Sequence, residues 1–181
     1  MTVNTHEQRH GSKMEWLTPL WIFEALGVEF DLDVCAPVGR PTHVPAARSY
    51  TIEVDGLLAP WQGRVWMNPP FGTANGVHEW LHRFYQHGNG IGIIRADTPT
   101  SWWHDYVSQS PVIVLPRGRV RYINNNEGQE KAHGGPGFAS ALFCAGDECA
   151  AILRDRGHRI GAAWDRAAQT TNSAHAAVAR K

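Results

Sequence analysis

Short apolar runs alternate with stretches of helical periodicity along most of this chain of 181 residues. Strands are expected at 29–36, 64–67, 90–94, 112–115 and 138–144, and helices at 18–26, 77–86, 100–107 and 148–156. The clearest helix is 77–86, where apolar residues recur at the spacing of one helix face: Val77, Trp80, Leu81, Phe84 and Tyr85. Because strands that alternate with helices favour parallel pairing, we predict an α/β fold with a doubly wound, mostly parallel sheet.

The chain is long enough for one domain with a substantial core. We expect a flexible tail at 1–13, a single domain at 14–169 and a polar tail at 170–181. Hydrophobic residues make up 43% and charged residues 19%, which is typical of soluble globular proteins. No apolar stretch approaches the roughly 20 residues that span a bilayer. The three cysteines form neither a disulfide framework nor a zinc pattern, and no secretory signal is visible, so we expect a reducing, cytoplasmic setting.

Local signals predict where elements begin and end. Thr18 is a good N-cap and Pro19 suits the first helical position, while Gly27 is a typical C-cap. Residues 37–48 are rich in Pro, Gly and small side chains, so we expect a long connection there. Asp55-Gly56 predicts a turn.

The tetrapeptide Asn68-Pro69-Pro70-Phe71 follows a short apolar strand and precedes the helix at 77–86. Ligands in open α/β sheets bind at the carboxyl ends of strands. Because Asn68, Asp97 and the segment around Asp33 all fall at or near such ends, we predict that they share one site.

This tetrapeptide suits a chemistry in which an exocyclic amino group of a planar base is held. The side chain of Asn68 and the carbonyl of Pro69 would accept its two hydrogens, and Phe71 would offer a face for stacking. Consecutive prolines restrict the backbone and so preorganise the acceptors. The structural alternative is a proline turn that only begins the next helix.

The chain resembles the phage-type (Dam-like) DNA N6-adenine methyltransferases over residues 15 to about 145. The matching segments occur in the family's order at 15–19, 30–37, 55–57 with Trp61, 65–71, 118–122 and 137–140. The resemblance implies S-adenosylmethionine as methyl donor, DNA as partner and the Rossmann-like methyltransferase fold.

The resemblance also assigns roles by position. Asn68, Pro69, Pro70 and Phe71 would form the catalytic site. The donor would be held by Thr18 and Pro19 at its methionine part, by Asp33 and Ala36 in the first binding loop, and by Asp55, Gly56 and Leu57 near its adenosine. Each of these donor assignments has a structural alternative as a helix start, a loop cap or a turn.

The sequence departs from the amino-methyltransferase pattern in two ways. The first donor loop, 33–39, contains one late glycine where a glycine-rich loop is usual, and no separate target-recognition domain is visible. Residues 37–48 and 117–137 are the candidates for reading DNA sequence. Arg117, Arg119 and Arg121 alternate at strand period and so share one face, either as phosphate contacts or as a solvated edge strand.

Other functions remain open at this stage. Cytosine-N4 methylation would use the same amino chemistry, and a catalytically idle DNA-binding relative is a further alternative. His78-Glu79-Trp80-Leu81-His82 also fits the zinc-protease pattern, but the apolar stripe leaves both histidines on the flank of the helix, and we expect no metal site. The recognition sequence and the oligomeric state are not predicted.

Overall fold

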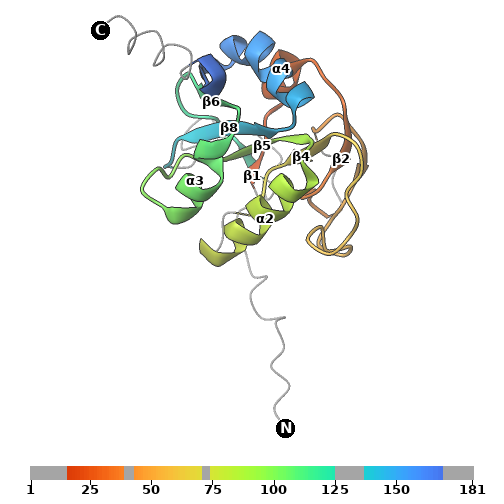
Figure 1. Ribbon diagram of the computed structural model, residues 1–181. Coiled ribbons are helices and arrows are strands. Elements are labelled where there is room, and N and C mark those ends of the chain that lie inside the picture. Colours follow the sequence, from red (N-terminus) through yellow and green to blue (C-terminus); the bar gives the residue numbers. More distant parts are fainter. Residues whose placement is uncertain (1–15, 39–42, 71–73, 125–136, 169–181) are drawn as a thin grey trace, which may run out of the picture.

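A seven-stranded sheet organises the computed structural model, which describes residues 16–38, 43–70, 74–124 and 137–168 (Figure 1). Its strand order is β3-β2-β4-β5-β8-β6-β9. The strands are β2 (Phe30–Asp33), β3 (Ala46–Ser49), β4 (Val65–Met67), β5 (Gly90–Arg95), β6 (Val112–Pro116), β8 (Ser140–Ala145) and β9 (Gly161–Asp165). All five strands predicted from apolar runs are therefore confirmed.

The sheet is mixed, so the prediction of a mostly parallel sheet is confirmed only in part. Strands β3, β2, β4 and β5 pair in parallel, whereas β8 pairs antiparallel with both β5 and β6, and β9 pairs antiparallel with β6. A parallel pair needs a crossover connection, usually a helix. In the described part of the chain no helix lies between β6 and β8. The start of β8 lies beside the carboxyl end of β6, so the two strands are antiparallel.

Helices cover both faces of the sheet, as the alternating pattern predicts (Figure 1). Helices α1 (Leu20–Leu26) and α4 (Asp147–Arg156) pack on one face, and α2 (Ala74–His87) and α3 (Ser101–Asp105) on the other. The predicted helix at 100–107 is α3 followed by a separate 3₁₀ turn, Val107–Gln109. Among the described residues, no helix combines the length and the apolar character needed to cross a membrane.

Four strands were not predicted. Strand β3 overlaps the end of the connection expected at 37–48. Strands β3 and β9 are the two outer strands of the sheet. Three of the four residues of β3 are exposed, so no apolar alternation marks it. Strands β1 (Trp16–Leu17) and β7 (Ile123–Asn124) form a separate antiparallel pair, and the two described residues of each are too few to give a periodic pattern.

The start of α1 also differs from the prediction. Pro19 is the N-cap residue, and Thr18 does not cap the helix, because its hydroxyl makes no hydrogen bond with the described residues. Leu17 is paired with Ile123 in the β1–β7 ladder, and Thr18 lies one residue before the N-cap Pro19. The predicted C-cap is confirmed: Gly27 has φ of 58° and its N–H donates to the Phe23 carbonyl at 2.7 Å.

Gly56 is predicted to be indispensable for the packing of the turn that follows β3. An added Cβ would collide with the Val34 carbonyl oxygen and lie 2.8 Å from the Trp80 ring. We therefore expect Gly56→Ala to lower the free energy of unfolding by about 1–3 kcal/mol, measured by urea denaturation. Gly137→Ala is the matched control, because no atom lies within 4 Å of its added Cβ. Equal stability of the two variants would contradict this account.

Candidate functional site

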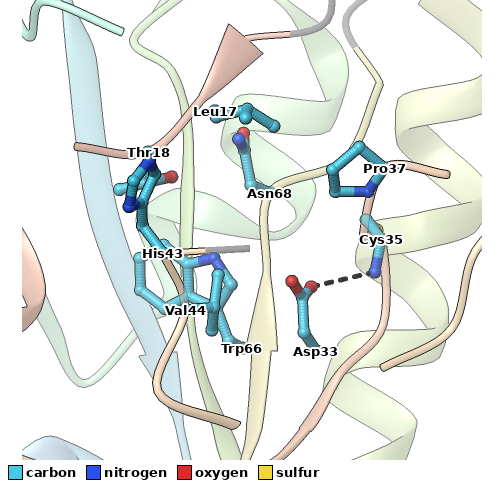
Figure 2. Close-up of a pocket in the computed structure, with 9 residues that line it drawn as sticks. All are labelled: Leu17, Thr18, Asp33, Cys35, Pro37, His43, Val44, Trp66 and Asn68. Atoms are coloured by element: carbon cyan, nitrogen blue, oxygen red, sulfur yellow. Dashed lines mark hydrogen bonds between the residues drawn. The ribbon is translucent and has the colours of Figure 1, made fainter. Parts of the chain in front are cut away.

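A pocket lies at the carboxyl ends of β2 and β4, where it is closed by the segment that links β1 to α1. Figure 2 shows the side chains that line it: Leu17, Thr18, Asp33, Cys35, Pro37, His43, Val44, Trp66 and Asn68. Asp33 is the last residue of β2, and Asn68 directly follows β4. The predicted convergence of these two strand ends is confirmed. The cavity itself is narrow, at about 20 Å³.

The side-chain amide of Asn68 is oriented by a backbone group. Its Nδ2 donates a hydrogen bond of 2.7 Å to the Trp16 carbonyl oxygen. A carbonyl oxygen can only accept, so the NH₂ end of the amide must face Trp16 and the Oδ1 end must face elsewhere. This Oδ1 is buried and has no hydrogen-bond partner among the described residues. The result is an acceptor whose direction is set by the Trp16 carbonyl and to which no described residue donates.

No sequence pattern indicates that Trp16 supports Asn68. Trp16 is placed by the β1–β7 ladder, in which it lies opposite Asn124. Its ring also contacts the Tyr122 ring edge to face, with centroids 6.3 Å apart. The supporting group is a main-chain carbonyl, which any residue type supplies, so no side-chain pattern could have revealed it.

Two further polar atoms of the pocket residues are buried without a described partner. They are Oγ1 of Thr18, a residue 4% exposed, and Nε1 of Trp66, which is fully buried. An unsatisfied buried polar group costs roughly 1–3 kcal/mol, so these atoms are available to a polar ligand. The sequence predicted a role for Thr18 but missed Trp66, whose contacts with Phe23 and Phe30 make it an ordinary core residue in a β-strand.

A carboxylate and a thiol complete the polar lining. Oδ1 of Asp33 accepts the Cys35 backbone N–H at 3.1 Å (Figure 2). Burial, together with the nearby Asp33 carboxylate, raises the pKa of the Cys35 thiol well above its ordinary value, although the Asn68 backbone N–H opposes the shift. The thiol is therefore protonated at neutral pH. The negative charge of Asp33 favours a cationic group in this pocket.

The two prolines of the tetrapeptide directly follow Asn68. Pro69 is buried and Pro70 is exposed. Phe71 lies outside the described residues. Ala36 is 7% exposed, and its N–H donates to the Tyr50 carbonyl at 2.8 Å, which ties the loop after β2 to the segment after β3.

The segment Asp55-Gly56-Leu57 forms the predicted turn but does not line the pocket. Asp55 has φ of 47°, and its Oδ1 accepts the Leu57 N–H at 3.0 Å. The Gly56 carbonyl accepts the Trp61 indole N–H at 2.7 Å. The turn packs beside Val34, next to the end of β2, so the local structure explains these residues without a ligand.

Arg117, Arg119 and Arg121 are all exposed, whereas Val120 and Tyr122 are buried. The expected alternation is therefore present, but the segment is not a strand, so the alternative of a solvated edge strand is wrong. It follows the carboxyl end of β6, which runs in the same direction as β4 and β5. The arginine segment thus begins at the same end of the sheet as the pocket, the carboxyl ends of the parallel strands.

Asp97 also lies near the carboxyl end of a strand, β5, but its carboxylate binds Arg95 and not the pocket. Its Oδ2 accepts a hydrogen bond of 2.6 Å from Arg95 Nη2, and it does not line the pocket. The expectation that it shares the site with Asn68 is not supported.

The two histidines of the zinc-protease pattern lie on α2, where both contact the ring of Tyr106. Both contact Tyr106 edge to face, at centroid distances of 5.1 Å for His78 and 6.4 Å for His82. Nε2 of His78 is 3.7 Å from Oδ2 of Asp105. Within the described ranges, no group of three or more His, Cys, Asp or Glu side chains is arranged to hold a metal ion.

Comparison with known proteins identifies the family. The family model described as DNA N-6-adenine-methyltransferase (Dam) matches residues 5–146, which is more than half of the chain. No curated protein and no solved structure gives a match. The matched region includes the pocket, the tetrapeptide and the arginine segment. The chain therefore belongs to the DNA N-6-adenine-methyltransferase (Dam) family.

Proposed function

We propose that the chain transfers a methyl group from S-adenosylmethionine to the exocyclic N6 of adenine in DNA. Membership of the Dam family supports this activity. The observation that carries the proposal is the state of Asn68: its Nδ2 is bound to the Trp16 carbonyl, and its buried Oδ1 has no partner among the described residues.

The chemistry requires such an acceptor. The lone pair of an adenine amino nitrogen is delocalised into the ring, so the nitrogen is a poor nucleophile. An acceptor on each of its two hydrogens draws the nitrogen toward tetrahedral geometry and makes the lone pair available. Asn68 Oδ1 is one acceptor in this proposal, and the Pro69 carbonyl is the other. Because both are held before the base arrives, they require little reorganisation during the reaction.

The target base must leave the duplex to reach this site. Phe71 is the proposed stacking surface for the extruded base. Pro70 restricts the backbone of Pro69 and thereby the direction of the Pro69 carbonyl.

The pocket residues fit one end of the methyl donor in their chemistry. S-adenosylmethionine supplies an electrophilic methyl group on a positively charged sulfur and carries an amino acid end with both charges. Asp33 would favour its positive charge, and the unpartnered Thr18 hydroxyl and Trp66 N–H would bind its polar groups. A cavity of about 20 Å³ is far smaller than the donor, so these residues hold only a part of it. Pro19, Ala36, Asp55, Gly56 and Leu57 remain proposed contacts of the remainder.

DNA binding is assigned to the arginine segment. Arg117, Arg119 and Arg121 are exposed at the pocket edge of the sheet, where guanidinium groups can neutralise phosphates. The net charge of the chain is zero, so a local cluster has to supply this attraction. Sequence reading is assigned to 37–48 and 117–137, parts of which lie outside the described residues.

Labelled donor tests the proposed function. The protein is incubated with tritiated S-adenosylmethionine and unmethylated duplex DNA, and the DNA is digested to nucleosides. We expect the label in N6-methyladenine nucleoside. Label in N4-methylcytosine would contradict the choice of base, and donor and DNA binding without any label would identify an idle relative.

Asn68→Ala removes the oriented acceptor. We expect turnover to fall roughly 10²–10³-fold, the usual effect of losing one preorganised hydrogen-bonding group, while the donor Kd stays within about twofold. Asn89→Ala is the matched control, because Asn89 precedes β5 at the opposite sheet edge and its Oδ1 accepts the Cys149 thiol. Unchanged turnover in Asn68→Ala would contradict the proposed mechanism.

Trp66→Phe removes the unpartnered N–H and keeps an aromatic ring against Phe23 and Phe30. We expect the donor Kd to rise roughly tenfold, as for the loss of one hydrogen bond of about 1.4 kcal/mol, in equilibrium binding. Trp102→Phe changes a buried tryptophan of the other core cluster and should leave this Kd unchanged. Equal affinities in both variants would show that Trp66 serves packing alone.

A further inference from the structure

We infer that Tyr122 and Ser140 are positioning residues for Asn68, acting through the Trp16 carbonyl. The inference rests on the proposed function, in which the direction of Asn68 Oδ1 determines the rate of methyl transfer. Neither residue lines the pocket.

The backbone of Trp16 needs support beyond its own strand pairing. In the described part of the chain, Trp16 belongs to a strand of two residues, which pairs with Ile123 and Asn124 of β7. This pair is not part of the seven-stranded sheet, and two-stranded pairs on their own are marginally stable. The 2.7 Å bond to Asn68 Nδ2 therefore needs another contact that fixes Trp16.

Tyr122 supplies that contact. Its ring is 2% exposed and meets the half-buried Trp16 ring edge to face, at 6.3 Å and 64°. Such aromatic pairs are more stable than their burial alone accounts for, and they have a preferred geometry. Tyr122 also directly precedes β7, so it restrains Trp16 through its ring and through the neighbouring backbone.

Ser140 fixes Tyr122 to the rigid sheet. The Tyr122 hydroxyl and Ser140 Oγ are hydrogen bonded at 2.9 Å, and both groups are buried. Ser140 is the first residue of β8 and lies opposite Arg95 in the longest ladder of the described sheet. Burial raises the pKa of Tyr122, so the phenol remains protonated and the pair remains neutral. The connected groups run from β8 through Tyr122 and Trp16 to Asn68.

The hydroxyl pair is unnecessary for filling space, because Phe would occupy the same volume as Tyr122. Its removal would instead allow the ring, and with it Trp16, to shift. A misplacement of about 1 Å can reduce an enzymatic rate roughly 100-fold. We therefore expect an effect on turnover and not on ligand affinity.

Tyr122→Phe and Ser140→Ala test the inference in the full chain, with Ser110→Ala as the matched control. Ser110 is a buried serine at the opposite end of the sheet, where its hydroxyl donates to the Val112 carbonyl at 2.7 Å. Both test variants should lose kcat roughly tenfold or more, with the donor Kd and the KM for duplex DNA within about twofold. The double variant should be no slower than either single one, because the two hydroxyls act as a unit.

A second readout does not depend on activity. In ¹⁵N NMR spectra, the side-chain NH₂ signals of Asn68, assigned through their loss in Asn68→Ala, report its bond to Trp16. We expect these signals to shift or broaden in Tyr122→Phe and Ser140→Ala, and to stay unchanged in Ser110→Ala.

Several outcomes would overturn the inference. These are an unchanged kcat with unchanged Asn68 signals, an equal loss of kcat in Ser110→Ala, or a raised KM for DNA with an unchanged kcat. A wild-type protein that methylates no DNA refutes the proposed function instead. In that event the Asn68 signals still decide whether Tyr122 and Ser140 position the amide.

Discussion

The hydrogen bond from Asn68 Nδ2 to the Trp16 carbonyl is the constraint on which the site depends. An amide side chain can rotate and exchange its donor and acceptor ends, so a free Asn68 would present either end to a base. A partner that only accepts removes this ambiguity. The bond joins two segments that are 52 residues apart, and the fold is needed to bring them together.

The arrangement of the strands explains how Asn68 and the Trp16 carbonyl are brought together. Parallel strands β2 and β4 end side by side, so Asp33 and Asn68 reach one edge, which is the usual ligand-binding edge of an α/β sheet. The β1–β7 pair lies at the same strand ends, where it places the Trp16 carbonyl beside Asn68 and the Thr18 hydroxyl at the pocket. Three buried polar atoms that have no partner among the described residues belong to residues of this pocket, Thr18, Trp66 and Asn68, whereas the turn at Asp55 satisfies its own backbone.

Sequence patterns predicted the parts of the fold that repeat. Helix 77–86 and the buried strands were predictable because burial imposes a period, and Asn68 and Asp33 because strand ends converge. Strands β3 and β9 were not predicted because they are edge strands without apolar alternation. Strands β1 and β7 were not predicted because the two described residues of each have no period. Thr18 was misassigned as a helix cap because the β1–β7 ladder, which keeps it outside the helix, joins distant segments. Trp66 was missed because a buried tryptophan in a strand has an ordinary packing explanation.

A crystal structure of the protein with duplex DNA and a donor analogue that cannot react would test the central claim most directly. The account predicts that the exocyclic nitrogen of the extruded adenine lies about 3 Å from Asn68 Oδ1, while Nδ2 keeps its bond to the Trp16 carbonyl. An adenine amino group bound elsewhere, or an Asn68 amide detached from Trp16 in the complex, would contradict it.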